Sequence, residues 1–482
     1  MRLRRLRQPI HISWLIALGC LSFVIGVWLA LYVSLGEWWI GLVGVGCLGL
    51  GFWRRRVYIL PLIVVGGVAI GIWHGSVSSD ALHIYQPLIG KQVSLSGHIK
   101  DDPVTNAKGQ LVIQLDAIKA DAHNLPGSVW ASILGKPDLK RGDEVVVVGE
   151  LSIGFGSYAG ALYTAKITAI THPQPGDIAR VVRDWFVSGI HRAIPEPAAS
   201  LGIGYVVGLK SALPDDLAQA LQTAGLSHVV VASGYNLTIL VRLARRLLVK
   251  VSKYLAMISA SVMIVCFVAV TGLSPSMTRA GLVSGLSLAA WYYGRAFHPF
   301  VLLPLAAATT VALQPNYIWG DVGWELSFAA FAAVMIVGPL FQRYFFGDKK
   351  PGTIRQILGE TVAAHIVTIP IILLAFGMLS NIAIPANLLV VPLVPLAMLL
   401  TFIAGIAGLV VPAIASWVGL PATWLLEYMI TTTQYLANLP WAQTKLVAPW
   451  WISPAYYVVL AGICVYVWRV TKFSLRTASI VE

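Results

Sequence analysis

Long apolar runs separated by short polar segments make up most of the chain. Many of these runs are about 17 to 25 residues long, which is enough for one α-helix to cross the ~30 Å hydrocarbon core of a bilayer. The pattern predicts a polytopic α-helical membrane protein of eleven or twelve spans, of which two are short enough to be re-entrant, 281–294 and 300–314. The candidate spans are 13–35, 38–53, 57–73, 225–241, 254–273, 281–294, 300–314, 324–341, 358–378, 386–410, 413–437 and 450–470.

Residues 91–172 follow a different pattern, in which apolar and polar residues alternate along short runs. Alternation with a period of two is typical of strands with one buried face. Turn-forming pairs such as Lys108-Gly109 and Pro126-Gly127 separate the runs. Five short antiparallel strands in this space predict a small β-barrel of the OB type. The expected strands are 93–99, 111–118, 128–134, 144–151 and 162–170.

The composition of this barrel segment bears on its role. Many OB barrels bind single-stranded nucleic acid through a basic groove with stacking aromatic side chains. Residues 91–172 hold eight basic and eight acidic residues and few aromatic ones, chiefly Trp130, Tyr158 and Tyr163. This balance favours a structural or docking role for the barrel, and direct nucleic-acid binding is the alternative.

An amphipathic helix is expected within residues 176–197. Apolar residues recur there three and four positions apart, and charged residues occupy the other face. We expect this helix to lie in the outer interface of the membrane with Trp185 at headgroup depth, and a partner-binding helix is the alternative. The apolar face comprises Ile178, Val181, Val182, Trp185, Phe186 and Ile190, and the polar face Arg180, Arg183, Asp184 and Arg192.

Composition and charge add orientation to this picture. A soluble globular protein is excluded, because 57% of the residues are hydrophobic and 11% are charged, against roughly 25% charged in soluble domains. The net charge of +13 is no measure of DNA affinity, since 20 of the 34 Lys and Arg residues lie in six short segments on one side of the predicted spans. By the positive-inside rule those segments are cytoplasmic, so both termini are expected inside and residues 75–222 outside. The four cysteines fall in apolar runs and predict neither disulfides nor a metal site: Cys20, Cys47, Cys266 and Cys464.

Polar residues inside the apolar regions are the candidate functional residues, because a buried ionisable group is costly unless it is paired or hydrated. Four segments qualify: 225–236, 272–280, 321–330 and 370–395. In the last one, prolines that include Pro385 and Pro392 predict broken helices that line a pathway. The candidates for a translocation pathway are His228, Ser233, Asn236, Arg279, Glu325, Ser327 and Asn387.

Arg279 is the strongest single signal, since a mid-membrane arginine is rarely retained without a partner or a wet cavity. We expect it to line a pore, and the alternative is a structural ion pair with a carboxylate such as Glu325. Serines such as Ser233 and Ser327 are more often small residues that let helices pack closely. A nucleophilic Ser233 with His228 as its base is disfavoured, because no carboxylate evidently orients the histidine. No enzymatic activity, metal or cofactor is expected, and no NTP-binding motif is present.

Taken together, three of these segments resemble the ComEC family of competence proteins. Gly-x-Ser-His at 225–228 runs into Ser233-Gly234, and is followed by Pro-Ser-x-x-Arg-Ala at 275–280 and Gly-aromatic-x-Leu-Ser-Phe-x-Ala at 323–330. The resemblance covers most of the chain. It implies passage of single-stranded DNA across the bacterial cytoplasmic membrane during natural transformation, and it points to His228, Ser233, Arg279 and Ser327.

The resemblance also implies partners and an organisation. A separate receptor and nuclease outside would supply the single strand, and a cytoplasmic helicase or translocase would drive it. Asn236 and Glu325 stand where many relatives have histidine and glutamine, respectively. The chain also lacks the metallo-β-lactamase-like domain of long relatives, so we expect a short form without nuclease chemistry. Transport of another polymer or a small solute, and a membrane hydrolase, are the alternatives. The expected parts are three spans in 1–74, the external OB-like domain in 75–175, the amphipathic helix in 176–197, a competence-type membrane domain in 198–470 and a cytoplasmic tail in 471–482.

Overall fold

The chain forms two compact units, each built from two separate stretches of sequence. The computed structural model describes residues 10–472 apart from 107–108, 121–122, 136, 174–175, 231–233, 273–274, 295–298, 348–351 and 447. The first unit comprises Met1–Gly176 and Phe297–Glu325, and the second comprises Asp177–Ala296 and Leu326–Glu482.

The protein is a polytopic helical membrane protein. Among the described residues, eight helices are long and apolar enough to cross a bilayer, and they coincide with eight of the predicted spans. The total of eleven or twelve spans stays a prediction. The eight are Ile12–Leu29, Val57–Leu88, Lys253–Thr271, Val322–Phe346, Ile354–Phe376, Ala383–Val410, Pro412–Ala437 and Ile452–Thr471.

The other four predicted spans are also largely helical over their described residues. Trp38–Arg54 and Phe300–Leu313 are shorter apolar helices. The predicted span 281–294 belongs to a helix that begins earlier, at Pro275. The predicted span 225–241 contains a four-residue helix and the beginning of a second helix, with residues between them that lie outside the described part of the chain.

The first unit contains helices that pack through small residues. Gly26 and Gly71 lie so close that a Cβ on Gly26 would overlap the Val68 carbonyl oxygen and one on Gly71 the Phe23 carbonyl oxygen. Small residues let apolar helices approach closely when no hydrophobic effect drives them together in lipid. The helical elements of this unit are α2 (Ile12–Leu29), α3 (Trp38–Arg54), η1 (Val57–Ile59), α4 (Leu60–Leu82), η2 (His83–Leu88), α12 (Pro299–Leu313) and η4 (Pro315–Trp319), and α13 (Val322–Ala332) begins in it.

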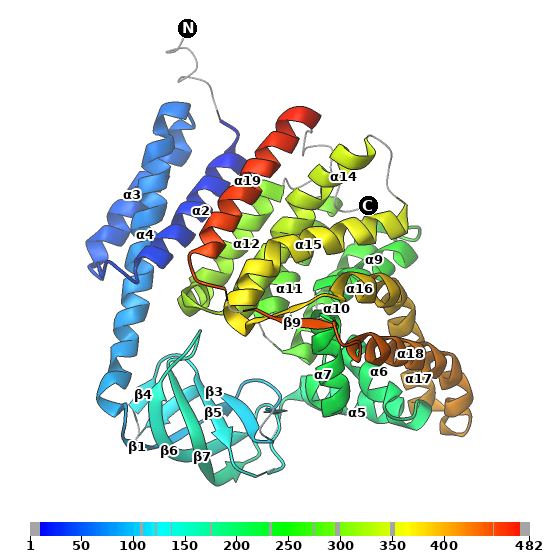
Figure 1. Cartoon of the computed structure of the whole chain (residues 1–482). Coiled ribbons are helices and arrows are strands. Elements are labelled where there is room, and N and C mark those ends of the chain that lie inside the picture. The colour runs from blue at the N-terminus through cyan, green and yellow to red at the C-terminus, as the bar shows by residue number, and fades with distance from the viewer. Residues whose placement is uncertain are drawn as a thin grey trace. The chain divides into compact units, whose positions relative to one another are not determined.

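A β-barrel continues from α4 in the same unit (Figure 1). The order β1-β6-β7-β5-β3 closes on itself, because β3 also pairs with β1; β5 and β7 are parallel and the other pairs are antiparallel. The five predicted strands and the OB-like barrel are confirmed, and the short strands β2 and β4 were not predicted. The strands are β1 (Gln92–Ile99), β2 (Val104–Thr105), β3 (Leu111–Ala120), β4 (His123–Leu125), β5 (Val129–Ile133), β6 (Glu144–Ile153) and β7 (Gly160–Thr171).

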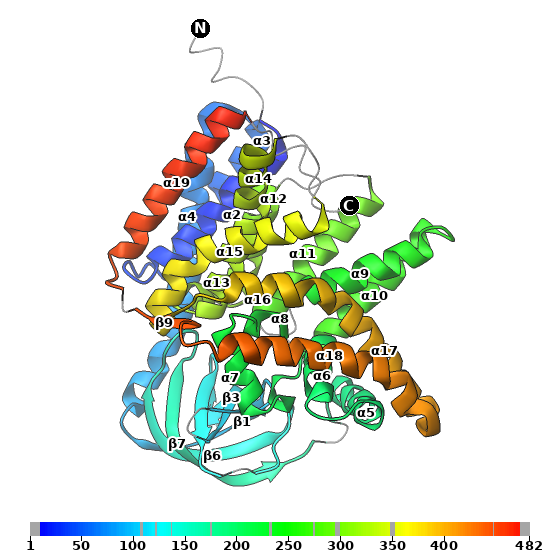
Figure 2. The ribbon, with the colours of Figure 1, turned by 45° about the vertical axis from the view of Figure 1, so that its right-hand side comes forward.

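The second unit is helical, and its largest core lies among α5, α6, α16, α17 and α18. Figure 2 shows α9 and α10 running side by side. Its helical elements are α5 (Ile178–Ala193), α6 (Ala198–Val207), η3 (Lys210–Ala212), α7 (Asp215–Thr223), α8 (Ser227–Val230), α9 (Gly234–Leu248), α10 (Lys253–Thr271), α11 (Pro275–Tyr292), the rest of α13, η5 (Ala333–Val337), α14 (Gly338–Phe346), α15 (Thr353–Phe376), α16 (Ala383–Val390), η6 (Val391–Leu393), α17 (Val394–Val410), η7 (Pro412–Ile414), α18 (Ala415–Ala437) and α19 (Ile452–Thr471). The strands β8 (Met378–Ser380) and β9 (Gln443–Lys445) pair in a two-stranded antiparallel sheet.

The amphipathic helix α5 packs on α17 with one part of its apolar face. Ile190 is fully buried, the Phe186 ring meets the Phe402 ring at a centroid distance of 5.6 Å, and Gly189 touches Gly408. Ile178, Val181, Val182 and Trp185, nearer the beginning of the helix, are exposed. An exposed apolar face is what an interfacial helix needs, and its position in the membrane stays a prediction.

Candidate functional site

Arg279 lies in the second turn of α11, which begins at Pro275. Proline suits the first position of a helix, where its missing N–H group costs no hydrogen bond. Met277 and Ala280 on either side of Arg279 are almost fully buried and fix this turn in the core of the second unit. The arginine is thus held on a rigid helix end.

Two aromatic rings of α13 face the guanidinium group. The Arg279 Cζ atom lies 5.7 Å from the centroid of the Phe328 ring and 5.6 Å from that of Phe331. Residues three apart share one face of a helix, so both rings reach the same cation. Each cation–π contact contributes about 0.5 to 2 kcal/mol, depending on how much water is excluded.

The Arg279 side chain keeps unused hydrogen-bonding capacity. Its Nε atom is shielded from solvent and finds no acceptor, and among the described residues of the second unit no carboxylate pairs with the guanidinium. A buried donor without an acceptor costs about 1 to 3 kcal/mol. An anion that reached this group would therefore gain a charge-assisted hydrogen bond that the described residues leave unmade.

The beginning of α9 lies against the same turn of α11. A Cβ on Gly234 would stand 3.2 Å from the Ala280 Cβ and 4.0 Å from the nearer terminal nitrogen of Arg279. Three stretches that are separated by tens of residues in the sequence therefore meet around Arg279: Gly234 at the beginning of α9, the Pro-Ser-x-x-Arg-Ala segment and the Leu-Ser-Phe segment.

The fourth polar segment meets the first one at Gly225. A Cβ on Gly225 would lie 3.0 Å from the Ala383 Cβ and 3.6 Å from the Ser380 Oγ atom. The Ser380 hydroxyl is buried without a hydrogen-bond partner. Asn381 stabilises the adjacent β8–β9 sheet, because its Nδ2 atom donates to the Trp441 carbonyl and to the Thr444 hydroxyl, each at 2.8 Å.

The remaining candidates differ in their surroundings. His228 is exposed on α8, and Ser327 and Glu325 are half-buried on α13, with Glu325 assigned to the first unit. The Asn236 amide is fully buried and donates to the Tyr205 carbonyl at 3.1 Å. Asn387 is buried and donates to the Ala383 carbonyl at 2.7 Å. Ser233 lies outside the described residues.

Sequence reasoning missed one residue of this site, Phe331, and one contact, that of Ser380 with Gly225. Phe331 was not selected, although its spacing of three from Phe328 was available as a signal. The contact of Ser380 with Gly225 had no such signal, because it joins positions far apart in the sequence.

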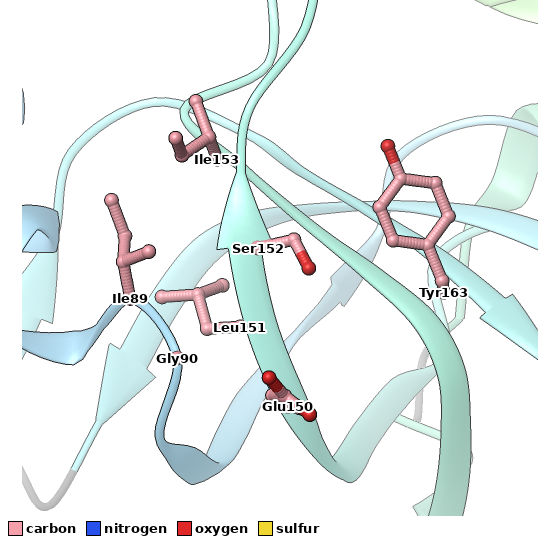
Figure 3. Close-up of a pocket in the computed structure, with 7 residues that line it drawn as sticks. All are labelled: Ile89, Gly90, Glu150, Leu151, Ser152, Ile153 and Tyr163. Atoms are coloured by element: carbon pink, nitrogen blue, oxygen red, sulfur yellow. The ribbon is translucent and has the colours of Figure 1, made fainter.

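The barrel brings its aromatic residues together on one side. Trp130 meets Tyr163 and Phe155 at centroid distances of 5.5 Å each, and Phe155 meets Tyr158 at 5.3 Å. Tyr163 also borders a shallow groove of about 410 Å³ between Ile89 and strands β6 and β7 (Figure 3). Glu150 is the one charged residue among the described residues that line it, so the groove itself offers no cation for a phosphate.

A polar cluster joins the barrel to the segment that precedes α13, within the first unit. The Ser157 hydroxyl donates to Asp321, and the Asn316 amide donates to the Ser157 carbonyl at 3.4 Å. Burial raises the pKa of Tyr317 to about 12, helped by the carboxylates of Asp321 and Asp101. Burial also raises the pKa of Asp101, an effect that the nearby Lys100 partly offsets.

No metal centre accompanies these sites in the described part of the chain, where no three His, Cys, Asp or Glu side chains are grouped to hold an ion. The fold and the site define a multi-pass helical membrane protein with an OB-like barrel and, where three of its polar segments meet, an arginine whose Nε atom is buried without an acceptor. A family model described as competence protein matches residues 205–471, more than half of the chain, and the chain belongs to that family.

One curated relative extends this comparison. The chain is 24% identical over 251 residues to ComE operon protein 3 of Bacillus subtilis (strain 168). The match covers 51% of this chain but 31% of that protein, so the chain spans about a third of the relative's length. No solved structure matches the chain.

Proposed function

We propose that this protein takes part in DNA uptake during competence, and that it passes single-stranded DNA across the bacterial cytoplasmic membrane. Membership of the competence family supports the process. The convergence of the polar segments on Arg279 supports the transport step, because a polymer with one negative charge per nucleotide needs fixed positive charge or hydrated polar groups along its path.

In this proposal the candidate residues have different tasks. Arg279 contacts phosphates as they pass, and the rings of Phe328 and Phe331 hold its guanidinium in place. His228, Ser233, Glu325 and Ser327 supply further polar groups along the pathway. Asn236 joins α9 to α6 through the Tyr205 carbonyl, whereas Asn387 donates to the Ala383 carbonyl within its own helix α16.

The proposal requires other proteins. An external receptor and nuclease would deliver one strand, and a cytoplasmic helicase or translocase would pull it. The barrel would face the outside and dock these components. If the DNA strand contacts the barrel, its bases would stack on the aromatic cluster of Trp130, Phe155, Tyr158 and Tyr163.

The test is uptake of labelled DNA into the cytoplasm of a strain that lacks the gene and carries either the wild-type chain or none. We expect nuclease-protected label in the cytoplasm only with the wild-type chain, and DNA bound at the cell surface in both strains. Equal internalisation in both strains would refute the transport role. Uptake of a labelled small solute or another polymer in place of DNA would favour the alternative substrate.

A further inference from the structure

A dense cluster of basic residues lies where α9 and α10 join. Five basic residues fall within residues 242–253 without an acidic one: Arg242, Arg245, Arg246, Lys250 and Lys253. Arg242 and Arg246 stand four apart on α9, a spacing at which like charges repel and destabilise a helix. Among the described residues none of the five has a carboxylate partner, and the Arg242 Nε atom is buried without an acceptor.

Aromatic residues at the end of α11 organise this cluster. The Arg245 Cζ atom lies 4.9 Å from the centroid of the Trp291 ring, and the Lys253 Nζ atom lies 5.5 Å from the centroids of Trp291 and Tyr292. The rings thus hold one cation from α9 and one from α10 beside each other. Two cations fixed at one place form a receptor for an anion.

An exposed apolar stripe begins next to the cluster on α10. Ile258, Val262 and Val265 follow each other at four and three positions and have exposed fractions of 40%, 55% and 67%. Tyr254, one turn before Ile258 and next to Lys253, is exposed as well. The two features together match a molecule that carries an anionic head and an apolar tail.

We propose that the basic and aromatic residues at the α9–α10–α11 junction bind the phosphate headgroup of an anionic phospholipid, whose acyl chain lies along Tyr254, Ile258, Val262 and Val265. Basic pockets between transmembrane helices on the cytoplasmic side are suited to such headgroups, and the sequence places this cluster on that side. Arg245 and Lys253 contact the phosphate, and Arg246 and Lys250 add charge at the rim. The apolar stripe favours a lipid over a strand of DNA, which has no acyl chain to cover it.

The test uses the full chain in nanodiscs of phosphatidylcholine with or without phosphatidylglycerol, and it counts retained lipids by native mass spectrometry. We expect preferential retention of phosphatidylglycerol by the wild type. Because each basic residue near an anionic membrane surface contributes about a factor of five, Arg245→Gln with Lys253→Gln should reduce that preference roughly thirtyfold. The exchange Arg245→Lys with Lys253→Arg should keep most of it.

The matched control removes two cations elsewhere, with Lys140→Gln and Lys166→Gln on the barrel, and should leave retention unchanged. An unchanged melting temperature in pure phosphatidylcholine shows that the variants are folded. Equal retention of phosphatidylglycerol by the wild type and a folded Arg245/Lys253 variant would overturn the site. So would loss of binding to a labelled oligothymidylate in that variant with lipid retention intact, which would assign the cluster to DNA.

Discussion

Ser157, in the loop between strands β6 and β7, donates a hydrogen bond of 2.9 Å to the Oδ2 atom of Asp321. The other oxygen of the same carboxylate, Oδ1, accepts the backbone N–H of Trp324 at 2.8 Å and so caps the beginning of α13. One side chain therefore fixes the helix that carries Glu325, Ser327 and, further along, both phenylalanines, and it also fixes a loop of the barrel.

This double contact predicts unequal effects of substitutions. Asp321→Ala removes both the cap and the barrel contact and should destabilise the protein by about 1 to 3 kcal/mol. Ser157→Ala leaves the cap and should cost about 1 kcal/mol. Hydrogen exchange at α13 and at the β6–β7 loop would measure both changes. We expect Ser157→Ala to speed exchange at the loop only, and Asp321→Ala to speed exchange at both the loop and α13. Identical exchange profiles for the two variants would contradict separate roles for the two hydrogen bonds.

Asp101, in the same polar cluster, gives the barrel a pH dependence. Its pKa is raised by burial, so ionisation costs more in the folded state than in the unfolded chain. This cost is absent below the unfolded value of about 3.9 and grows as the pH rises through the folded pKa. Asp101→Asn should therefore raise the melting temperature at pH 7.5, and the gain should shrink at pH 4. A gain that is the same at both pH values would exclude ionisation of Asp101 as its cause.

The fold was predictable from sequence where one physical pattern dominated. Long apolar runs gave eight helices, and alternation gave five strands, because both patterns follow from backbone geometry and burial. The predicted span 225–241 differs more from the structure. The helix α9 continues to Leu248, and it is amphipathic because it carries Arg242, Arg245 and Arg246. The parallel pairing of β5 with β7 could not be predicted from the alternation, because that pattern shows which face of a strand is buried but not which strands are neighbours when the barrel closes.

The candidate site was predictable as a set of residue types but not as an arrangement. Arg279 stood out because a cation inside an apolar region is costly. The aromatic contacts of Arg279 could not be predicted, because phenylalanines such as Phe328 and Phe331 are equally common in ordinary helix packing. Whether a buried asparagine such as Asn236 faces a pathway or a backbone carbonyl depends on a neighbour that lies 31 positions away.

Close packing of α5 on α17 predicts a strong effect at a glycine. A Cβ on Gly408 would overlap the carbonyl oxygen of Gly189, and backbone atoms cannot turn aside as a side chain can. Gly408→Ala should therefore destabilise the protein by about 1 to 3 kcal/mol, seen as a lower melting temperature in detergent. The control is Gly462→Ala on α19, where an added Cβ meets open space and should change stability by less than about 0.5 kcal/mol. Equal melting temperatures for the two variants would contradict the close contact.

Membrane orientation is predicted by the six basic segments. With the four native cysteines replaced, a cysteine at Lys108 should react with a membrane-impermeant maleimide added to intact cells, and one at Lys350 should react only after the cells are opened. Both positions lie outside the described residues, so this prediction rests on the charge pattern alone. Protection at position 108 together with labelling at position 350 would invert the topology.

Arg279 should matter to transport more than to folding. Its guanidinium is held by two aromatic rings and, among the described residues of its own unit, by no carboxylate, so its removal leaves no unpaired carboxylate in that part of the chain. Arg279→Ala should abolish DNA internalisation and leave the protein level and the surface-bound DNA unchanged. Arg279→Lys should keep part of the activity, because the charge remains while the planar group that can form two parallel hydrogen bonds is lost.

The competing explanation is a structural ion pair, and it predicts a different pattern. If Arg279 neutralised a carboxylate such as Glu325, Arg279→Ala would leave that carboxylate buried and unpaired, at a cost of about 3 to 5 kcal/mol. Protein abundance in the membrane would then fall, and Arg279→Met with Glu325→Gln would restore it. Under the transport role the double variant is as abundant as the wild type and still inactive. Normal uptake by a well-expressed Arg279→Ala chain would exclude the pathway role, because the phosphates would then pass without the Arg279 guanidinium.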